Sequence, residues 1–536
     1  MKVIIKLIKR EVPGDQIVKD ERKIHSEEIN GVGTFYYKIS HSTKPEWVEQ
    51  FFNGKLRCRE KFKVATAAGV LLVTRHYEGD GDRTFAITFG SGRYLLCDNV
   101  TEERFGLKIA LNSIEYKSLR SMDYNKMEGV PSLVRNQVSR PTGIENFDIN
   151  TQVNLLRSIT GTLPDTPDAV GSLMTGADSL AISTSMSVDN VTRKLDSLYG
   201  LYKSDVYKQH FAWVDNISAI ADQTVIRALD QELLAKINQR VFENVWLALP
   251  SIVEWTNIDH LKYSGRNRNQ HPDVVLSEAV TELYGERNDI RPFELKIANI
   301  KAYDNGGTLY KEWSLYKCLN VEIIYQEKLY VLNDGSWYQV DRNFYESVER
   351  VYNDIGSSGI NFISWRPRFE EGKEKFEKEK IYNERLADSD TSLCNMDRDL
   401  VYLNGNQDKI EFCDVFSNTG QIIHVKRKGG SELIGHLLNQ GYVSATLMLT
   451  EEFRNKLNAK LKESNKDAWM VEQYSRDFDA NRYSIVYGVL CNDNEARVKL
   501  PFFSKVILKE VVTALRNFGF RVYLDRINKE QVERCN

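Results

Sequence analysis

The sequence predicts an α+β protein with a β-rich amino-terminal domain, a helical and mixed middle, and a carboxy-terminal α/β domain. Short runs that alternate apolar and polar residues fill the first 120 residues, which is the two-residue period of strands. Apolar residues take up helical spacing between about 186 and 250. With 536 residues, 42% of them hydrophobic, the chain can bury several cores, so disorder and a disulfide-stapled miniprotein are excluded.

Charge and cysteine usage narrow the class of protein further. The net charge of −3 provides no bulk cationic field, which argues against a histone-like or ribosomal role. The 7 cysteines occur singly, without a CxxC pair, which indicates a reducing compartment and argues against a thiolate zinc site. The run MKVIIKLIKREV is too short and too charged for a secretory signal, and no stretch approaches the roughly 18 apolar residues of a membrane span. We therefore expect a cytoplasmic protein that does not enter a membrane.

Four regions follow from changes in the sequence pattern. Residues 1–120 are expected to be the β-rich domain, 121–250 a turn-rich connection followed by helices, and 251–356 a mixed, β-containing region. In this last region Leu329–Asp341 predicts a hairpin that turns at Asn333–Gly335, because positive φ costs little at these residue types. Gly356–Gly359 is the expected linker to the last domain, 371–536. That domain is expected to begin with a helix over Glu371–Asp388, because glutamate and lysine recur there at i,i+4 spacing.

The order of elements in residues 371–536 is the most informative feature of the sequence. A charged helix is followed by three strand-like segments, an amphipathic helix from Ser431, a further strand, and a final helix and strand. This order resembles the core of the PD-(D/E)xK nucleases, in which the second strand carries Asp and the third carries (D/E)xK. The resemblance implies metal-dependent phosphodiester hydrolysis with Mg²⁺ or Mn²⁺.

Strand geometry brings the corresponding side chains together without reference to any family. Residues two apart on a strand share a face, so His424 and Lys426 are expected to project together while Val425 turns into the core. Only the short turn Ser417–Gly420 separates this strand from the preceding one. Asp414 is therefore expected to lie across from His424, at a pairing distance of about 5 Å.

These residue types suit phosphodiester hydrolysis. We assign Asp414 to hold the metal, Lys426 to stabilise developing negative charge, and Gln440 to orient the phosphate, with Glu384 completing the metal or lysine shell. His424 stands where the nuclease family has Asp or Glu, and we predict it as the second metal ligand. A neutral imidazole is a poorer ligand for Mg²⁺ and better suits Mn²⁺ or zinc.

Further residues are expected to contact nucleic acid, with DNA favoured over RNA. His436 and Gln440 lie at i,i+4 on the predicted helix, and Gln440-Gly441-Tyr442 is similar to the Gln and Tyr that flank the site of RecB-like nucleases. A second basic segment lies in the middle of the chain, beside Tyr263. The expected contact residues are Arg427, Lys428, His436, Tyr442, Lys262, Arg266 and Arg268.

A second resemblance extends over nearly the whole chain. Six segments carry it: FAITFGSGRYLL, FGLKIALN, LLRSITG, IEFCDVF, IIHVKRKGGSELIGHLLNQGYVSA and LPFFSKVIL. They resemble an uncharacterised, sporadically distributed bacterial family, domain of unknown function 6119. Patchy occurrence is typical of mobile or anti-phage genes. The resemblance therefore implies defence against phage or mobile elements, without implying a particular reaction.

A non-catalytic role stands beside the nuclease hypothesis. Asp–Lys pairs on adjacent strands are usually structural, and His424 replaces a metal carboxylate. The alternative is a catalytically inactive module that keeps the fold and binds nucleic acid or a protein partner, as a homo-oligomer or with a component of a defence system. Titration with Mg²⁺ and Mn²⁺ distinguishes the two, because a folded protein that binds neither ion favours the binding module.

Overall fold

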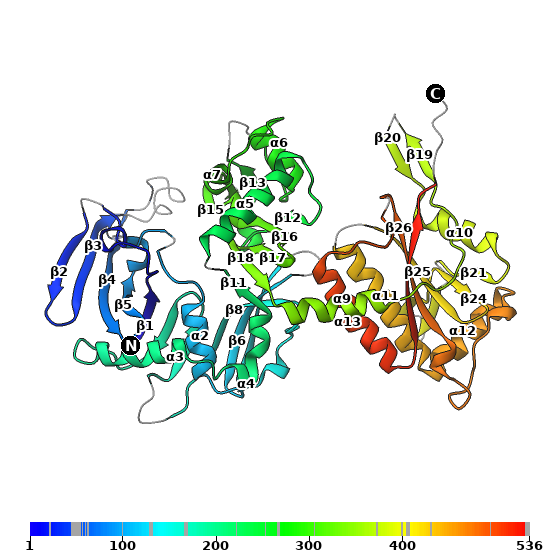
Figure 1. Ribbon diagram of the computed structural model, residues 1–536, viewed down its shortest axis with the longest axis horizontal. Coiled ribbons are helices and arrows are strands. Elements are labelled where there is room, and N and C mark those ends of the chain that lie inside the picture. Colours follow the sequence, from blue (N-terminus) through cyan, green and yellow to red (C-terminus); the bar gives the residue numbers. More distant parts are fainter. Residues whose placement is uncertain are drawn as a thin grey trace. The chain divides into compact units, whose positions relative to one another are not determined.

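A computed structural model describes most of the chain (Figure 1). The described residues are all of 1–536 except 21–22, 44–54, 56, 59–60, 62–63, 99, 128–131, 166–169, 221, 252, 265–268, 305, 371–372, 398–399, 404–407, 429–430, 494 and 531–536. They form two compact units, one of residues 1–125 and 133–215 and the other of residues 126–132 and 216–536. In the described part of the chain, no helix has both the length and the apolar character needed to cross a membrane.

The first unit is built on a ten-stranded sheet in the order β2-β3-β4-β5-β1-β10-β9-β8-β6-β7. Its register is antiparallel wherever the pairing is described, as in Ile5 opposite Ile87 and Ile182 opposite Met174. The strands are β1 (Lys2–Leu7), β2 (His25–Ile29), β3 (Gly33–Thr43), β4 (Val64–Tyr77), β5 (Gly81–Gly90), β6 (Leu119–Lys126), β7 (Ser132–Thr142), β8 (Asn154–Thr162), β9 (Leu173–Gly176) and β10 (Leu180–Ser183). The sheet thus runs well past residue 120, and the first part of residues 121–250, where the sequence predicts a turn-rich connection, supplies strands β7 to β10 instead.

Helix α2 (Phe105–Ser113) packs on one face of this sheet, next to α3 (Val191–Lys203). The close approach depends on glycine, because a Cβ at Gly106 would lie 2.1 Å from the carbonyl oxygen of Ser179, and one at Gly176 would lie 2.2 Å from that of Gly106. Apolar side chains of α2, α3 and the strands bury one continuous core. That core supplies the main stabilisation of the unit.

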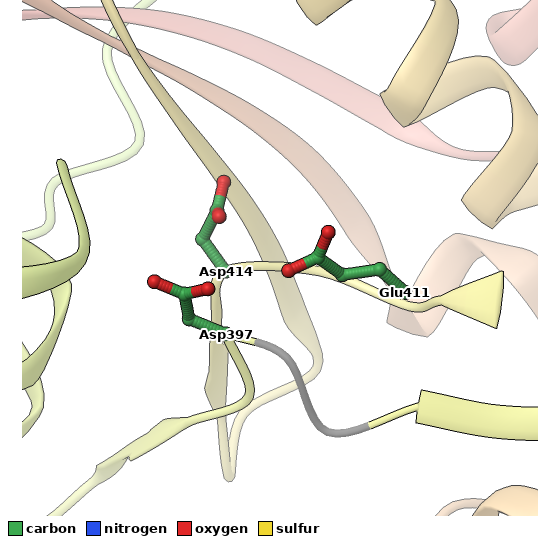
Figure 2. A group of neighbouring side chains, drawn as sticks. All are labelled: Asp397, Glu411 and Asp414. Carbon is green, nitrogen blue, oxygen red and sulfur yellow. The ribbon is translucent and has the colours of Figure 1, made fainter. Parts of the chain in front are cut away.

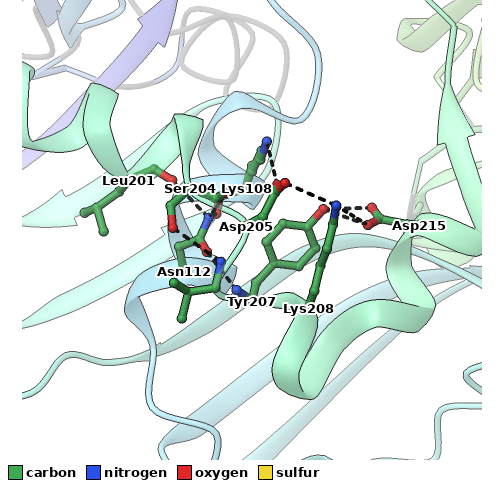
Figure 3. A network of polar contacts seen from close by, with 9 residues as sticks. Lys108, Asn112, Leu201, Ser204, Asp205, Tyr207, Lys208 and Asp215 are labelled. Atoms are coloured by element: carbon green, nitrogen blue, oxygen red, sulfur yellow. Dashed lines mark hydrogen bonds and ion pairs between the residues drawn. The ribbon is translucent and has the colours of Figure 1, made fainter.

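A polar network fastens the end of α2 to the segment after α3, which leads into α4 (Lys208–Phe211) (Figure 3). The Asn112 amide donates to the carbonyls of Lys108, Leu201 and Ser204 at 2.9–3.0 Å, and its oxygen accepts from the backbone N–H of Tyr207 at 2.8 Å. The Tyr207 hydroxyl donates to Asp215. The two N–H groups of this amide are therefore shared among three carbonyls, and one asparagine links the end of α2 to the segment after α3.

The amino-terminal part of the second unit has two sheets, ordered β11-β18-β17-β16-β12 and β13-β14-β15. The hairpin predicted at Leu329–Asp341 is present as β17 and β18, and Asp334 and Gly335 take φ values of 48° and 74° in its turn. The elements are β11 (Ile217–Ala219), α5 (Gln223–Asn238), β12 (Val245–Leu247), β13 (His260–Tyr263), α6 (Leu276–Tyr284), α7 (Pro292–Ile297), β14 (Asn299–Tyr303), β15 (Leu309–Ser314), α8 (Leu315–Cys318), β16 (Leu319–Tyr325), β17 (Lys328–Asn333), β18 (Ser336–Val340) and α9 (Arg342–Asp354).

The carboxy-terminal part is a five-stranded mixed sheet in the order β21-β24-β25-β26-β27. Strand β24 runs antiparallel to β25, whereas β25, β26 and β27 are parallel to one another. The elements are β19 (Pro367–Glu370), β20 (Lys373–Phe376), α10 (Glu379–Ser389), β21 (Leu393–Asn395), β22 (Leu400–Leu403), β23 (Asp408–Glu411), β24 (Val415–Ser417), β25 (Gln421–Arg427), α11 (Ser431–Met448), α12 (Glu451–Glu463), β26 (Ser484–Cys491), α13 (Phe502–Asn517) and β27 (Arg521–Asn528).

Both faces of this sheet are covered, which explains the continuous apolar run of β26. On one face Ile422, Ile485 and Tyr487 pack with side chains of α11, α12 and α13. On the other face Ile423 and Val425 pack with α10 and Trp365. The alternation expected along β25 is therefore observed, with Val425 1% exposed on the α10 face.

One expectation for the start of this region is wrong. Within the segment predicted as a helix over Glu371–Asp388, Lys373–Phe376 form strand β20, which pairs with β19, and helix α10 starts only at Glu379. There cross-strand pairing overrides the local charge pattern. The expected linker Gly356–Gly359 lies in a segment that is neither helix nor strand, and its Ser357 hydroxyl donates to Asp525 of β27 at 2.5 Å.

Candidate functional site

Asp414 directly precedes β24 and faces the adjacent strand β25. Because Val415 pairs with Ile423, Asp414 lies across from His424, as expected from the short turn. Its backbone N–H donates to the Ile423 carbonyl at 3.0 Å, and its carboxylate Oδ2 accepts from the Val425 N–H at 2.7 Å. The carboxylate is thus held at the start of β24 by the backbone of the next strand.

Two further carboxylates join Asp414 (Figure 2). Glu411 is the last residue of β23, and Asp397 lies in the turn after β21. One ligand oxygen from each of the three side chains lies within 4.8 Å of the other two. Asp397 and Asp414 are half-buried, and Glu411 is exposed. In the part of the chain that the structure describes, this is the one group of three or more His, Cys, Asp or Glu side chains close enough to share an ion.

A buried amide bridges two of these carboxylates. The Asn383 side chain, on α10, donates from Nδ2 to Asp414 at 3.3 Å and to Asp397 at 3.5 Å. Its Oδ1 is buried and has no hydrogen-bond partner within the described residues. A neutral amide therefore supports the cluster without cancelling its charge, and it keeps one unused acceptor beside the two carboxylates.

The electrostatics of the cluster raise the pKa of Asp414 to about 7. Burial of the carboxylate is the largest cause, and the negative charges of Glu411 and Asp397 raise the pKa further. The hydrogen bond from the Val425 N–H and the charge of Lys426 act in the opposite direction. An added cation would remove the repulsion and restore the ionised form.

Lys426 approaches the cluster near the end of β25, paired with Glu379 at the start of α10. The Lys426 Nζ lies 3.0 Å from the Glu379 carboxylate, and these side chains are 21% and 34% exposed. The other Glu379 oxygen accepts from the Arg427 N–H at 3.0 Å. Glu379 thus holds the lysine and the strand end together.

His424 lies on the opposite side of its strand from Val425, inside the core. It is 2% exposed, its Nε2 has no hydrogen-bond partner within the described residues, and its ring centroid is 6.5 Å from that of Tyr487. Burial lowers the pKa of His424 to about 3, so the imidazole stays neutral at ordinary pH. The structure does not place His424 in the group of ligand atoms formed by Asp397, Glu411 and Asp414.

The other residues assigned to the nuclease site are spread over two helices. Glu384 is exposed on α10 and pairs with Lys380 at 3.7 Å, whereas the carboxylate beside Lys426 is that of Glu379. On α11, His436 is exposed and Gln440 is half-buried. The Tyr442 ring packs 6.0 Å from that of Phe518, against the core between α11 and α13.

The basic residues predicted to contact nucleic acid lie in different surroundings. Arg427 is exposed beside Lys426, and the Lys428 Nζ forms an ion pair with Asp493 at 2.6 Å. Lys262, on β13, lies over the Tyr303 ring at 5.0 Å. Arg266 and Arg268 lie outside the described residues.

Comparison with known proteins gives a family. A family model described as "Family of unknown function (DUF6119)" matches residues 3–528. The chain belongs to DUF6119. Among curated proteins and solved structures, none matches this DUF6119 chain. The match covers both units, so the carboxylate cluster and the ten-stranded sheet are parts of one family sequence.

Sequence reasoning did not select Asp397, Glu411, Asn383 or Glu379. Glu411 lies three residues before Asp414, in a short hairpin strand whose pairing is with β22 and not with the main sheet. Asp397 comes from a turn whose course the sequence pattern does not specify. An acidic residue close to each end of the predicted strands was the available signal, but such residues are common on surfaces.

Proposed function

We propose that this protein is a divalent-metal-dependent phosphodiesterase that cleaves nucleic acid, with DNA favoured over RNA. The observation that carries the proposal is the cluster of Asp397, Glu411 and Asp414 at the start of β24, beside a lysine on the adjacent strand. Three carboxylates and a lysine are the groups that metal-assisted phosphoryl chemistry requires. The setting in defence against phage or mobile elements is part of this proposal and rests on the family resemblance.

The chemistry of the donor set fits Mg²⁺ or Mn²⁺. Both ions prefer oxygen ligands, and Mg²⁺ usually binds through one or two carboxylates together with water and substrate phosphate. The partly exposed Glu411 and Asp397 leave room for such water, while the Val425 N–H fixes the orientation of Asp414. A bound divalent ion would supply an activated water and polarise a phosphate oxygen.

Lys426 is suited to stabilise the negative charge that develops on the attacked phosphate. Its side chain is partly exposed, and the Glu379 carboxylate holds its ammonium group. In this proposal the position of the ammonium group is therefore fixed before substrate binds. Exposed Arg427, next in the chain, can hold the nucleic-acid backbone without entering the cluster.

The order of elements supports the same class of enzyme. Helix α10, strands β21, β24 and β25, helix α11 and strand β26 resemble the α-β-β-β-α-β order of the PD-(D/E)xK core, with the β22–β23 hairpin inserted before β24 and helix α12 inserted before β26. Asp414 directly precedes the second of these strands and Lys426 lies on the third, similar to the Asp and Lys of that pattern, whereas His424 takes the place of its second carboxylate. The insertion supplies Glu411, and the turn before it supplies Asp397.

In this proposal Glu411 and Asp397 join Asp414 as metal ligands, in place of His424, which the sequence predicted as the second ligand. The physical reason is that β25 is covered on both faces, so His424 is taken into the core with Ile422 and Tyr487. Its neutral, solvent-excluded ring packs and does not coordinate.

The test combines metal binding with cleavage by the full-length protein. We expect Mn²⁺ and Mg²⁺ to bind the parent in isothermal titration at pH 8, and Asp414→Asn to weaken Mn²⁺ binding at least tenfold. Glu384→Gln is the matched control, because that carboxylate lies on the exposed face of α10 and should leave binding and cleavage unchanged. Cleavage is measured on single- and double-stranded DNA and on RNA.

The outcomes separate the two hypotheses. Metal-dependent cleavage that is lost in Asp414→Asn and kept in Glu384→Gln supports the nuclease. Metal binding without cleavage of any substrate favours the inactive binding module. Absence of metal binding by the folded parent contradicts the proposed site.

A further inference from the structure

The first unit carries a hollow at one end of its ten-stranded sheet. The hollow has a volume of about 620 Å³ and is lined by residues of β6, β7 and β8 and of the start of β9. This volume lies within the range of small-molecule sites, roughly 300–1,000 Å³. The lining residues all belong to the first unit, so the hollow shares no residue with the carboxylate cluster.

Five of the nine lining residues carry hydroxyl groups. They come from Ser121, Ser139, Thr160, Thr162 and Ser172. Thr160 is hydrogen-bonded across the sheet to Thr175 at 2.9 Å, whereas the hydroxyls of the other four make no hydrogen bond within the described residues. The hollow therefore offers several donors and acceptors that the fold itself does not use.

Arg120 gives the hollow its charge. Its Nη1 donates to the Ser139 carbonyl at 3.3 Å, its side chain is half-buried, and it forms no ion pair within the described part of the chain. No carboxylate is among the described lining residues. A guanidinium with unused N–H donors among hydroxyl groups is the arrangement that recognises a phosphate.

We propose that this hollow binds the phosphate group of a small phosphorylated ligand of nucleotide size. Arg120 would pair with the phosphate oxygens, and the hydroxyls of Ser139, Thr162 and Ser172 would complete their hydrogen bonds. A metal cation does not fit, because no carboxylate is among the described residues that line the hollow. A neutral sugar fits less well, since none of the described lining residues offers an aromatic face for stacking.

The test is isothermal titration of the full-length protein, in EDTA, with adenosine monophosphate, inorganic phosphate and adenosine as probes. EDTA removes divalent ions, so a phosphate cannot be captured through metal at the carboxylate cluster. We expect adenosine monophosphate to bind, and Arg120→Gln to weaken its affinity at least tenfold. Arg140→Gln, on the same sheet but outside the hollow, should bind like the parent.

Thr162→Val keeps the side-chain shape and removes one unused hydroxyl, and it should weaken binding severalfold even if Arg120→Gln unfolds the unit. Inorganic phosphate binding as tightly as adenosine monophosphate would support phosphate recognition and identify the free ion as the occupant. Adenosine binding as tightly as adenosine monophosphate, or no probe binding at millimolar concentration, would overturn the proposal. Asp414→Asn should leave all three titrations unchanged, so this test does not depend on the metal site.

Discussion

Replacing Asp414 with asparagine should stabilise the metal-free protein at pH 8. The pKa of Asp414 is raised from 3.8 to about 7, and a tenfold change in an acid dissociation constant corresponds to about 1.4 kcal/mol, so ionising this carboxylate costs the fold at most about 4 kcal/mol. Since part of the side chain is solvated, we expect about half of this, ~2 kcal/mol, to be measured. Asparagine keeps the acceptor for the Val425 N–H and removes the charge that Glu411 and Asp397 repel.

The pH dependence follows from the sign of this pKa change. A carboxyl whose pKa is higher in the folded state than in the unfolded state loses stability as the pH rises from about 4, and the loss is complete above pH 7. The gain from Asp414→Asn should therefore be largest at pH 8 and shrink steadily toward pH 4.

The assay is urea unfolding of the parent and the variant in EDTA at pH 5 and pH 8, with hydrogen exchange at β24 and β25 to assign the transition to this unit. Added Mn²⁺ should stabilise the parent alone, so that at pH 8 the parent becomes more stable than Asp414→Asn. If Asp414→Asn is instead several kcal/mol less stable than the parent at pH 8 in EDTA, Asp414 is a structural partner of Lys426 and the reasoning is refuted.

Four further variants test other parts of the structure. Lys426→Met should lower single-turnover cleavage roughly 100-fold or more while Mn²⁺ affinity in isothermal titration stays within threefold, and an equal loss of both would contradict its role in charge stabilisation. His424→Ala should lower the free energy of unfolding by about 2–3 kcal/mol through a cavity and leave Mn²⁺ binding unchanged; loss of binding would make His424 a ligand after all. Burial raises the pKa of Glu322, which accepts from the Phe502 N–H at the start of α13, to about 7, so Glu322→Gln should flatten the fall in melting temperature between pH 4 and pH 7, and an unchanged slope would refute this. Asn112→Ala should lower the stability of the first unit by about 2–4 kcal/mol by leaving backbone groups unsatisfied, seen as faster hydrogen exchange after α3, and unchanged exchange would show that water replaces the amide.

Local patterns were sufficient for much of the carboxy-terminal sheet. Alternation along β25 placed Val425 in the core, and the short turn at Ser417–Gly420 set Asp414 across from His424. The turn at Asp334 and Gly335 followed from two residue types that accept positive φ. In each case the interacting residues are neighbours in sequence, so the physics that decides the structure acts over a few residues.

Tertiary structure decided what local patterns could not. The charged run after Glu371 has helical spacing, yet cross-strand pairing makes its first part a hairpin. His424 and Lys426 share a strand face by alternation, yet His424 is buried in the core, whereas Lys426, next to the last residue of β25, pairs with Glu379 at the start of α10. The sequence pattern of residues 371–536 predicted that Asp414 and Lys426 lie on neighbouring strand segments. Only the fold brought Asp397 and Glu411 to Asp414, because the turn after β21 and the β22–β23 hairpin return the chain to the start of β24.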